Sequence, residues 1–156
     1  MKGDAKVLAV LSQVLKAELT AINQYFLHAE MCENWGYKKL AQHTRKESIE
    51  EMKHAEELME RILLLDGTPN MIDYFKINIG QSVKQQLQND LNLEYEAVKR
   101  LNAGIETCVK AGDNGSRDLL EKILVDEEEH IDYLEAQLHA VDEMGIENYL
   151  AQHLHE

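Results

Sequence analysis

Apolar residues recur every three to four positions along four long stretches of the chain. That spacing puts them on one face of a helix, because an α-helix turns once every 3.6 residues. Glycines and the single proline fall between the stretches and mark the breaks. The pattern predicts an all-α protein with helices at roughly 4–34, 38–65, 82–111 and 116–143, followed by a short helix at 146–153.

Residues that commonly cap helices precede three of these stretches. Asp4 and Ser116 are each expected to accept a hydrogen bond from the first turn of a helix. Ser82 and Gln85 have the spacing of a capping box, in which each side chain bonds the backbone of the other residue. These residues support the predicted starts of the first, third and fourth helices.

The connections between the stretches determine how the helices pack. Short turns join the first helix to the second and the third to the fourth, so each pair is expected to be antiparallel. Residues 66–81 can extend about 50 Å, whereas a helix of this length spans about 42 Å. The sequence therefore predicts a four-helix bundle with one long crossover and a short C-terminal fifth helix. Residues 1–156 are interpreted as a single domain.

Charge and cysteine content narrow the classes of function. The formal net charge of −13 opposes binding to nucleic acid or to an anionic membrane and is compatible with attracting cations. Cys32 and Cys108 form no CxxC motif or disulfide framework, which fits a reducing compartment. No apolar run reaches the length of a membrane span, and no signal peptide is recognised. We expect a cytoplasmic location.

Each apolar stripe also carries a glutamate where a leucine would be expected, and two of these glutamates precede a histidine by three positions. The glutamates are Glu18, Glu51, Glu94 and Glu127, and the histidines are His54 and His130. Residues three apart share a helix face, so each Glu-x-x-His pair points at one place. The interval of 33 residues between the first two glutamates recurs between the last two, as if one helical hairpin had been used twice.

The cost of burying carboxylates indicates what these residues bind. A single unpaired carboxylate costs several kcal/mol to bury, and four together also repel one another. Two divalent cations would balance four carboxylates, with the two histidines as neutral ligands. Oxygen-rich ligation with one nitrogen per metal suits iron or manganese better than zinc or copper(I), whose sites are built on thiolates. One Glu-x-x-His pair would be weak evidence, but two at matched positions predict a dinuclear metal site.

Longer stretches then resemble one family over essentially the whole chain. "AINQYFLHAEM", "EEMKHAEELMERILLLDGTPN", "DLNLEYEA", "EEEHIDYLE" and "GIENYLAQHLH" are similar to bacterioferritins, which have a ferritin-like fold. The resemblance implies a hollow 24-subunit homo-oligomer that oxidises Fe(II) with O2 or peroxide and stores ferric mineral. It implies haem b shared between two subunits and assisting iron release, with a ferredoxin-type protein as a possible electron donor. The implied ferroxidase ligands are Glu18, Glu51, His54, Glu94, Glu127 and His130, with Glu51 and Glu127 bridging.

Met52 follows a predicted iron ligand but lies about 100° round the helix from it. With Glu56, Met59 and Leu63 it forms a second stripe on the flank of the helix, which suits a partner surface. A methionine in such a place is usually a packing residue. The family resemblance instead implies that Met52 is an axial ligand of the haem iron, paired with the same residue of a second subunit.

Several residues near the predicted site have two interpretations. Tyr25 shares a face with Glu18 and is either a core tyrosine or an electron donor to the iron pair. Glu47 and Glu50 could guide iron towards an inner surface, although Lys46 stands where many relatives have histidine and would weaken a site there.

Other polar residues have less defined expected roles. Asn34, Asp66 and Asp132 could line a pore at a subunit junction or simply be solvated. The remaining histidines, including His28 and His43, are expected at the surface or at interfaces, because they lack partners at ligand spacing.

Two alternative functions, from other classes of protein, have less support from the sequence than an iron-storage shell. A di-iron redox enzyme without storage, such as a rubrerythrin-type peroxidase or an oxygenase, is disfavoured by the missing CxxC motifs and by the short chain. A protective shell that binds DNA is opposed by the net charge and by the absence of a basic tail. Particle size separates these possibilities from a storage shell.

Overall fold

A computed structural model describes residues 1–155 and contains five helices within them. These are α1 (Ala5–Trp35), α2 (Lys38–Leu64), α3 (Val83–Ala111), α4 (Asn114–Met144) and α5 (Ile146–Ala151). The four long helices pack as a bundle, which confirms the predicted fold class. Each helix starts and ends within about two residues of the expected position, the usual uncertainty for frayed ends. None of the helices in this part of the chain is both long and apolar enough to cross a membrane.

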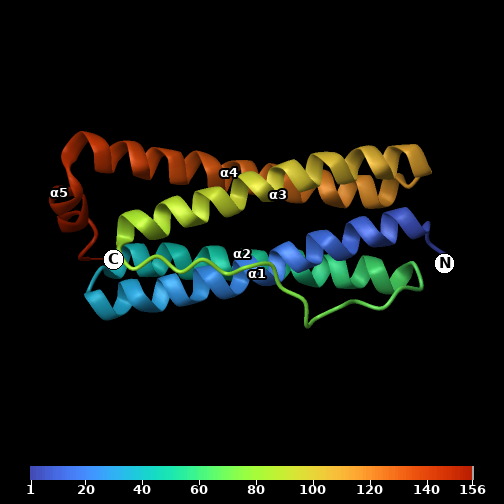
Figure 1. The fold of residues 1–156 in the computed structure, drawn as a ribbon, viewed down its shortest axis with the longest axis horizontal. Coiled ribbons are helices and arrows are strands. Elements are labelled where there is room, and N and C mark those ends of the chain that lie inside the picture. The colour runs from blue at the N-terminus through green and yellow to red at the C-terminus, as the bar shows by residue number, and fades with distance from the viewer. Residues whose placement is uncertain (156) are drawn as a thin grey trace.

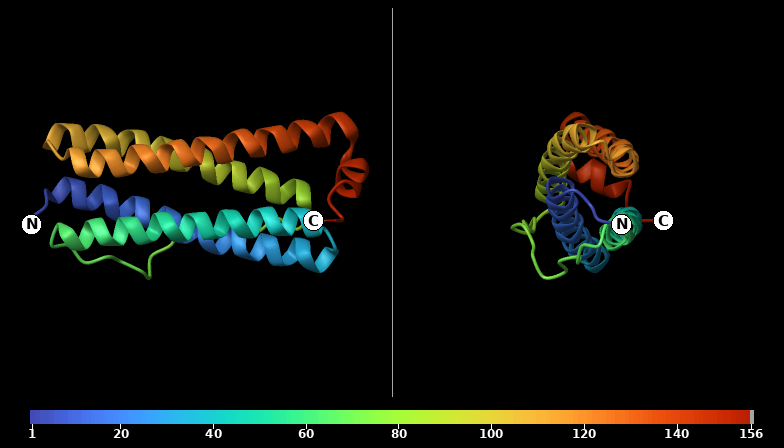
Figure 2. Two further views of the ribbon diagram at one scale, coloured as in Figure 1. Left: turned by 180° about the vertical axis from the view of Figure 1, so that it is seen from behind. Right: turned by 90° about the vertical axis from the view of Figure 1, so that its right-hand side faces the viewer.

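Figure 1 shows α1 beside α2 and α3 beside α4, with the segment between α2 and α3 running back along the bundle. In Figure 2 this crossover lies on the outside of the bundle, over α1, and α5 folds across one end. The segment brings the chain from the end of α2 to the opposite end of the bundle before α3 begins. The predicted long crossover is thereby confirmed.

Helix caps agree with the sequence at two of three places. The Asp4 carboxylate accepts hydrogen bonds from the backbone N–H groups of Lys6 and Val7, and Ser82 Oγ accepts one from the N–H of Gln85. Gln85 reaches back to the N–H of Gln81 rather than to that of Ser82, so the capping box is offset by one residue.

The expectation that Ser116 caps the fourth helix was wrong. Asp113 occupies the cap position and accepts the N–H of Ser116 at 2.9 Å, so α4 begins two residues earlier than expected. Gly112 makes this possible, because it ends α3 with a φ of 70°, a left-handed conformation that a side chain would strain. Asp113 then follows at once as the next cap.

The core consists of two apolar clusters separated by a polar layer. One cluster includes Leu11, Leu15, Leu58, Leu101 and Ile123, and the other includes Leu40, Leu87, Leu91, Leu134 and Tyr149. On α2, α3 and α4 the buried Glu51, His54, Glu94, Glu127 and His130 lie between the two clusters in sequence, and on α1 Glu18 lies at the edge of the first cluster, beside Leu19. Apolar packing on both sides therefore holds the four helices in place around a charged centre.

Three side chains of α1, spaced one turn apart, hold the crossover. Thr20 Oγ1 accepts the N–H of Phe75 at 2.9 Å, and Gln24 Oε1 accepts the N–H of Asn78 at 3.1 Å. His28 Nε2 accepts the N–H of Gly80 at 2.9 Å. These bonds satisfy backbone groups that a loop without strand or helix partners would otherwise leave unpaired.

His28 is a correction to the sequence interpretation, which placed it at the surface. Its side chain is 1% exposed, and Nδ1 lies 2.9 Å from a carboxylate oxygen of Asp90 on α3. Because Nε2 accepts the Gly80 N–H, Nδ1 must carry the proton and donate to Asp90. Gln24 donates to the same oxygen at 2.8 Å. His28 therefore joins α1, α3 and the crossover.

Candidate metal centre

The six predicted ligands come together in the middle of the bundle. Glu18 comes from α1, Glu94 from α3, and the two Glu-x-x-His pairs from α2 and α4. All six side chains are buried, and the most exposed of them, His54 and His130, are each only 5% exposed. The helical spacing identified in the sequence is what aims each pair inward, since residues three apart share a face.

Their donor atoms form two overlapping groups. One group is Glu18, Glu51, His54 and Glu127, and the other is Glu51, Glu94, Glu127 and His130; in each, the candidate ligand atoms lie within 4.8 Å of one another. Glu51 and Glu127 belong to both groups. That arrangement suits two metal ions side by side with two shared carboxylates, each ion having one further glutamate and one histidine.

Distances within each group are those of side chains turned towards a common point. His54 Nδ1 lies 3.1 Å from Glu127 and 3.6 Å from Glu18. His130 Nδ1 lies 3.2 Å from Glu51 and 3.4 Å from Glu127. Each histidine thus presents the same nitrogen, Nδ1, to the carboxylates of its group.

Unsatisfied polar atoms support a metal at this place. Seven buried side-chain atoms have no hydrogen-bond partner within residues 1–155, and all of them belong to the six candidate ligands: Glu18, Glu51, His54, Glu94, Glu127 and His130. Leaving one buried polar atom unpaired costs about 1–3 kcal/mol, so seven together would be a heavy loss without a compensating group. Metal ions would satisfy all seven atoms, and the carboxylate-rich donor set fits iron.

The other ring nitrogen of each histidine is held by a carboxylate that the sequence interpretation did not single out for this role. His54 Nε2 lies 2.8 Å from Asp126, and His130 Nε2 lies 2.9 Å from Glu50. A carboxylate in this position orients a metal-binding imidazole and makes it a better ligand. Asp126 directly precedes Glu127 and Glu50 directly precedes Glu51, a symmetry that the sequence contains but that became visible only in the packed bundle.

Electrostatics at the centre favour extra positive charge. Burial alone would lower the pKa of His54, but the close carboxylates of Glu127 and Glu51 outweigh it and raise the pKa to about 11. Burial likewise opposes the charged form of His130, and the surrounding carboxylates again raise its pKa. Burial, followed by the charge of Glu127, raises the pKa of Glu94. Without a metal, the buried carboxylates therefore favour protonated groups at the centre, and metal cations can replace these protons.

Tyr25 borders the centre. Its side chain is 1% exposed, and its hydroxyl donates a hydrogen bond to Glu94. Burial, and then the negative charge of Glu94, raise the pKa of Tyr25, so the phenol keeps its proton. This geometry satisfies the hydroxyl, as a core tyrosine requires, and also brings a phenol into contact with a candidate iron ligand.

A second small group of polar side chains adjoins His130. Glu47 is buried, and its carboxylate lies 3.6 Å from His130 Nδ1 and 2.6 Å from His43 Nε2. His43 also stacks on Tyr133 of α4 with ring centroids 3.7 Å apart. The expectation that His43 lacks a partner was therefore wrong, and its Glu47 partner stands at the helical spacing of four residues. Lys46 is exposed, and Glu50 is committed to His130.

Met52 points away from the centre, as its position on the helix predicts. Its side chain is 52% exposed, and Leu63, on the same flank of α2, is 60% exposed. Phe26 of α1 is also exposed, whereas Leu19 of the same helix is buried. A thioether on an exposed apolar surface is chemically suited to haem iron. The exposed position of Met52 is therefore compatible with its predicted role as a haem ligand, which stays a prediction.

The expected pore residues are not brought together within one chain. Asn34, Asp66 and Asp132 are all exposed and lie on α1, after α2 and on α4 respectively. The pore remains a prediction about subunit junctions.

Cys32 and Cys108 are buried in the two apolar clusters, as small core residues would be.

Comparison with known proteins agrees with this geometry. Residues 8–144 match the model of the ferritin-like domain of the Ferritin family. The chain is 54% identical over 152 residues to the bacterioferritin of Mycobacterium tuberculosis, covering 97% of this chain and 96% of that protein. It is 50% identical to the bacterioferritin of Streptomyces coelicolor (97% and 90% covered) and 45% identical to that of Brucella melitensis (96% and 92% covered). The chain belongs to the bacterioferritin family of ferritin-like proteins.

Proposed function

We propose that this protein is an iron-storage ferroxidase, which oxidises Fe(II) with O2 or peroxide at the buried centre and stores the ferric product. The observation that carries the proposal is the set of seven unpaired polar atoms, all on six side chains that form two ligand groups sharing Glu51 and Glu127. Family membership supports the same activity.

Fe(II) is the substrate, and the side chains of this chain bind and balance it. Four carboxylates neutralise two divalent ions, and the Nδ1 atoms of His54 and His130 add a neutral donor to each. Two Fe(II) ions lose one electron each, and O2 takes up the two electrons and two protons to become hydrogen peroxide. With hydrogen peroxide as the oxidant, two electrons and two protons convert it to two molecules of water. Asp126 and Glu50 keep the imidazoles oriented while the charge on the metals rises.

The same centre offers a place for protons to be held and released. In the metal-free centre protons gather on His54 and on the carboxylates, as the raised pKa values of His54 and Glu94 indicate. Binding of Fe(II) displaces those protons, because the ligands must be deprotonated to coordinate. Tyr25, with its hydroxyl on Glu94, is proposed as an electron donor beside the centre.

Removal of one terminal ligand tests the ferroxidase assignment. Glu18→Ala deletes a carboxylate that belongs to one ligand group only, so one of the two ions loses a charged ligand. Rapid Fe(II) oxidation, followed by the rise of ferric absorbance after mixing with O2, is expected to fall by about two orders of magnitude, in line with loss of a charged catalytic group. Glu106→Ala, which removes an exposed glutamate of α3, is the matched control and should oxidise iron normally. Full activity in Glu18→Ala would refute the assignment.

Haem binding is proposed at Met52. The thioether on the exposed flank of α2 would hold the haem iron together with the Met52 of a second subunit related by a two-fold axis. Bound haem supplies one-electron redox chemistry, which would assist reductive release of stored iron. Purified protein should show haem absorbance that Met52→Leu abolishes, and the variant should keep its Fe(II) oxidation rate. Unchanged haem absorbance in Met52→Leu would exclude Met52 as the ligand.

The proposed store is a hollow 24-subunit shell in the cytoplasm, reduced by a ferredoxin-type donor. The exposed apolar flank with Met52 and Leu63 supports subunit pairing, because surfaces of this kind commonly mark protein interfaces. The acidic charge supports attraction of iron cations to the particle.

A further inference from the structure

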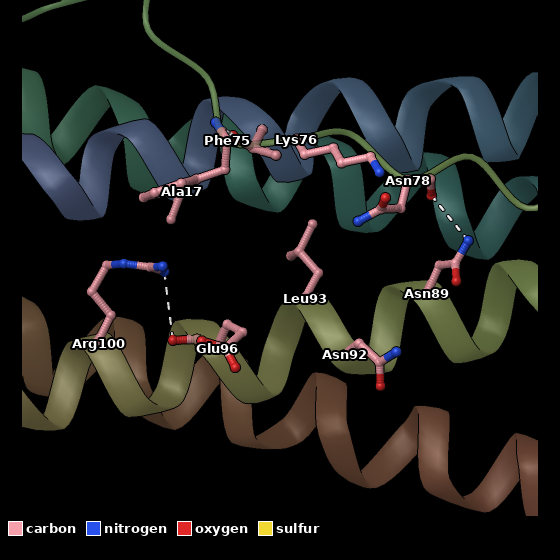
Figure 3. Close-up of a pocket in the computed structure, with 10 residues that line it drawn as sticks. Ala17, Phe75, Lys76, Asn78, Asn89, Asn92, Leu93, Glu96 and Arg100 are labelled. Carbon is pink, nitrogen blue, oxygen red and sulfur yellow. Dashed lines mark hydrogen bonds between the residues drawn. The ribbon is translucent and has the colours of Figure 1, made fainter.

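A cavity of about 320 Å³ lies between α1, α3 and the end of the crossover (Figure 3). None of the six metal-centre side chains is among the residues that line it. Ala17, Leu93 and Phe75 provide its apolar surface, and polar and charged side chains surround them: Thr20, Lys76, Asn78, Asn89, Asn92, Glu96 and Arg100. This mixture of a few apolar surfaces and converging polar groups is typical of small-molecule sites.

The walls of the cavity are held by hydrogen bonds. Thr20 and Gln24 of α1 accept the backbone N–H groups of Phe75 and Asn78, as described above. The Asn89 side chain of α3 donates to the carbonyl of Asn78 at 3.2 Å, so the crossover is tied to both helices (Figure 3). A ligand entering this space would not need to order the loop first, which saves the conformational cost of binding.

Positive charge gathers around Phe75. The Lys16 ammonium lies 4.4 Å from the ring centroid, and the Arg100 guanidinium lies 4.5 Å from it. Lys76 lines the same cavity. Among the described residues, the lysine and arginine ion pairs involve other side chains, and Lys16, Lys76 and Arg100 have no carboxylate within 4.0 Å. Three cations without an ion-pair partner around one cavity are notable in a chain of net charge −13.

Arg100 has the largest unused binding capacity. Its guanidinium Nη1 donates to the backbone carbonyl of Glu96 at 3.5 Å, a distance at which a hydrogen bond is weak. Burial lowers the pKa of Arg100, and the charge of Glu96 only partly offsets that effect. A half-buried guanidinium without a close acceptor is suited to a planar carboxylate, which can accept two of its N–H groups at once.

Further donors lie towards the other end of the cavity. Figure 3 shows Arg100 at one end, Asn78, Asn89 and Asn92 at the other, and Leu93 between them. Asn92 accepts a hydrogen bond from Gln88 through Oδ1, which leaves its amide N–H groups to donate. The charge of the lining also favours an anion, because the cations Lys76 and Arg100 outnumber the single carboxylate of Glu96. Lys16 adds a further positive charge beside Phe75.

We propose that this cavity binds a small organic dicarboxylate. One carboxylate pairs with Arg100, the other accepts hydrogen bonds from Lys76 and the asparagine amides, and the carbon chain between them lies over Ala17 and Leu93. The spacing of donors at two ends around an apolar middle selects against inorganic phosphate, which concentrates its charge at one point.

Equilibrium dialysis of radiolabelled succinate against the assembled protein tests this proposal. Saturable binding is expected, and Arg100→Gln should weaken it by roughly tenfold or more, the loss expected for a charge-assisted hydrogen-bonded pair. Lys99→Gln is the matched control, because it removes the same charge from an exposed neighbour on α3 and should bind succinate normally. Absence of saturable binding, or an equal loss in both variants, would overturn the proposal.

Two further measurements keep the test decisive. Lys76→Gln changes an exposed crossover side chain, so it should fold normally and should weaken succinate binding several-fold; unchanged affinity would count against the site. Inorganic phosphate is expected to displace succinate poorly, and displacement at equal concentration would identify a general anion site instead. Arg100→Gln should oxidise Fe(II) at the normal rate, so failure here is independent of the ferroxidase proposal.

Discussion

At the scale of single residues, the histidine partners are the least obvious part of the metal centre. Asp126 holds His54 Nε2 at 2.8 Å, and this fixes which nitrogen faces the carboxylates. Asp126 itself does not belong to either ligand group. Its effect on iron must therefore pass through the orientation and basicity of His54.

Asp126→Ala is expected to weaken metal binding by roughly 10- to 100-fold without removing a ligand. Anaerobic titration with Co(II), followed by its visible absorbance, measures this affinity independently of iron oxidation. Glu128→Ala removes an exposed carboxylate two residues away and should leave the titration unchanged. An affinity equal to that of the unmodified protein would mean that Asp126 does not support His54.

The convergence of the candidate ligands could be predicted from sequence because helical periodicity fixes the direction of each side chain. Glu51 and His54 share a face in any regular helix, so their convergence required no knowledge of tertiary structure. Glu50 and Asp126 could not be assigned in the same way. Each one lies beside a ligand in sequence, but it bonds a histidine on the other helix of the α2–α4 pair, and that contact depends on how the helices pack.

At the scale of elements, the turn between α3 and α4 is fastened to the end of α2. Arg61 of α2 donates to Asp113 at 2.7 Å and to Ser116 Oγ at 3.0 Å, while Ser116 Oγ donates to Asp113 at 2.7 Å. Burial would raise the pKa of Asp113, but the hydrogen bonds from Ser116 and Arg61 outweigh it and lower the pKa. The charged carboxylate is therefore favoured in the folded state.

Asp113→Asn tests that contribution through its pH dependence. The pKa of Asp113 is lower when folded than the value of about 3.9 expected when unfolded. Its charge therefore stabilises the fold above about pH 4, and the stabilisation disappears as the pH falls through the folded pKa. Asparagine also caps helices, so the variant should lose about 1–2 kcal/mol at pH 7 and almost nothing in acid.

Thermal unfolding followed by circular dichroism between pH 3 and pH 7 measures the difference. Asp118→Asn is the control, because Asp118 forms an exposed pair with Lys122 at 2.9 Å, and such pairs contribute little. A constant difference between Asp113→Asn and the unmodified protein at all pH values would show that the charge of Asp113 is not the cause.

The direction of the crossover could be predicted from the sequence, but its path over the helices could not. Its length predicted that it runs along the bundle, because only an extended segment can join the far ends of two parallel helices. Its path over Thr20, Gln24 and His28 was not predictable, because each bond pairs a side chain with a backbone group more than fifty positions away. His28 lacked a partner at helical spacing for the same reason, since Asp90 lies on another helix.

At the scale of the whole molecule, one chain forms the complete candidate metal centre but leaves an apolar surface exposed. All six candidate ligands come from a single bundle, so a monomer would already hold both metals. The side chains of Phe26, Met52 and Leu63, by contrast, are exposed on adjoining α1 and α2, where the Arg45 guanidinium lies 5.9 Å from the centroid of the Phe26 ring. Oxidation could thus occur without assembly, whereas storage and a shared haem could not.

Particle size decides between storage and a redox enzyme without storage. Twenty-four chains of 17.9 kDa give a shell of about 430 kDa, a mass that sedimentation velocity resolves easily from a monomer or dimer. We expect the large particle in the unmodified protein and in Glu18→Ala, because the metal centre lies inside the bundle and away from the exposed flank. Phe26→Glu should shift the population towards smaller species, since a charge buried at a subunit interface is costly. A monomer or dimer for the unmodified protein would contradict the storage proposal while leaving the dinuclear centre intact, and would instead favour a di-iron redox enzyme.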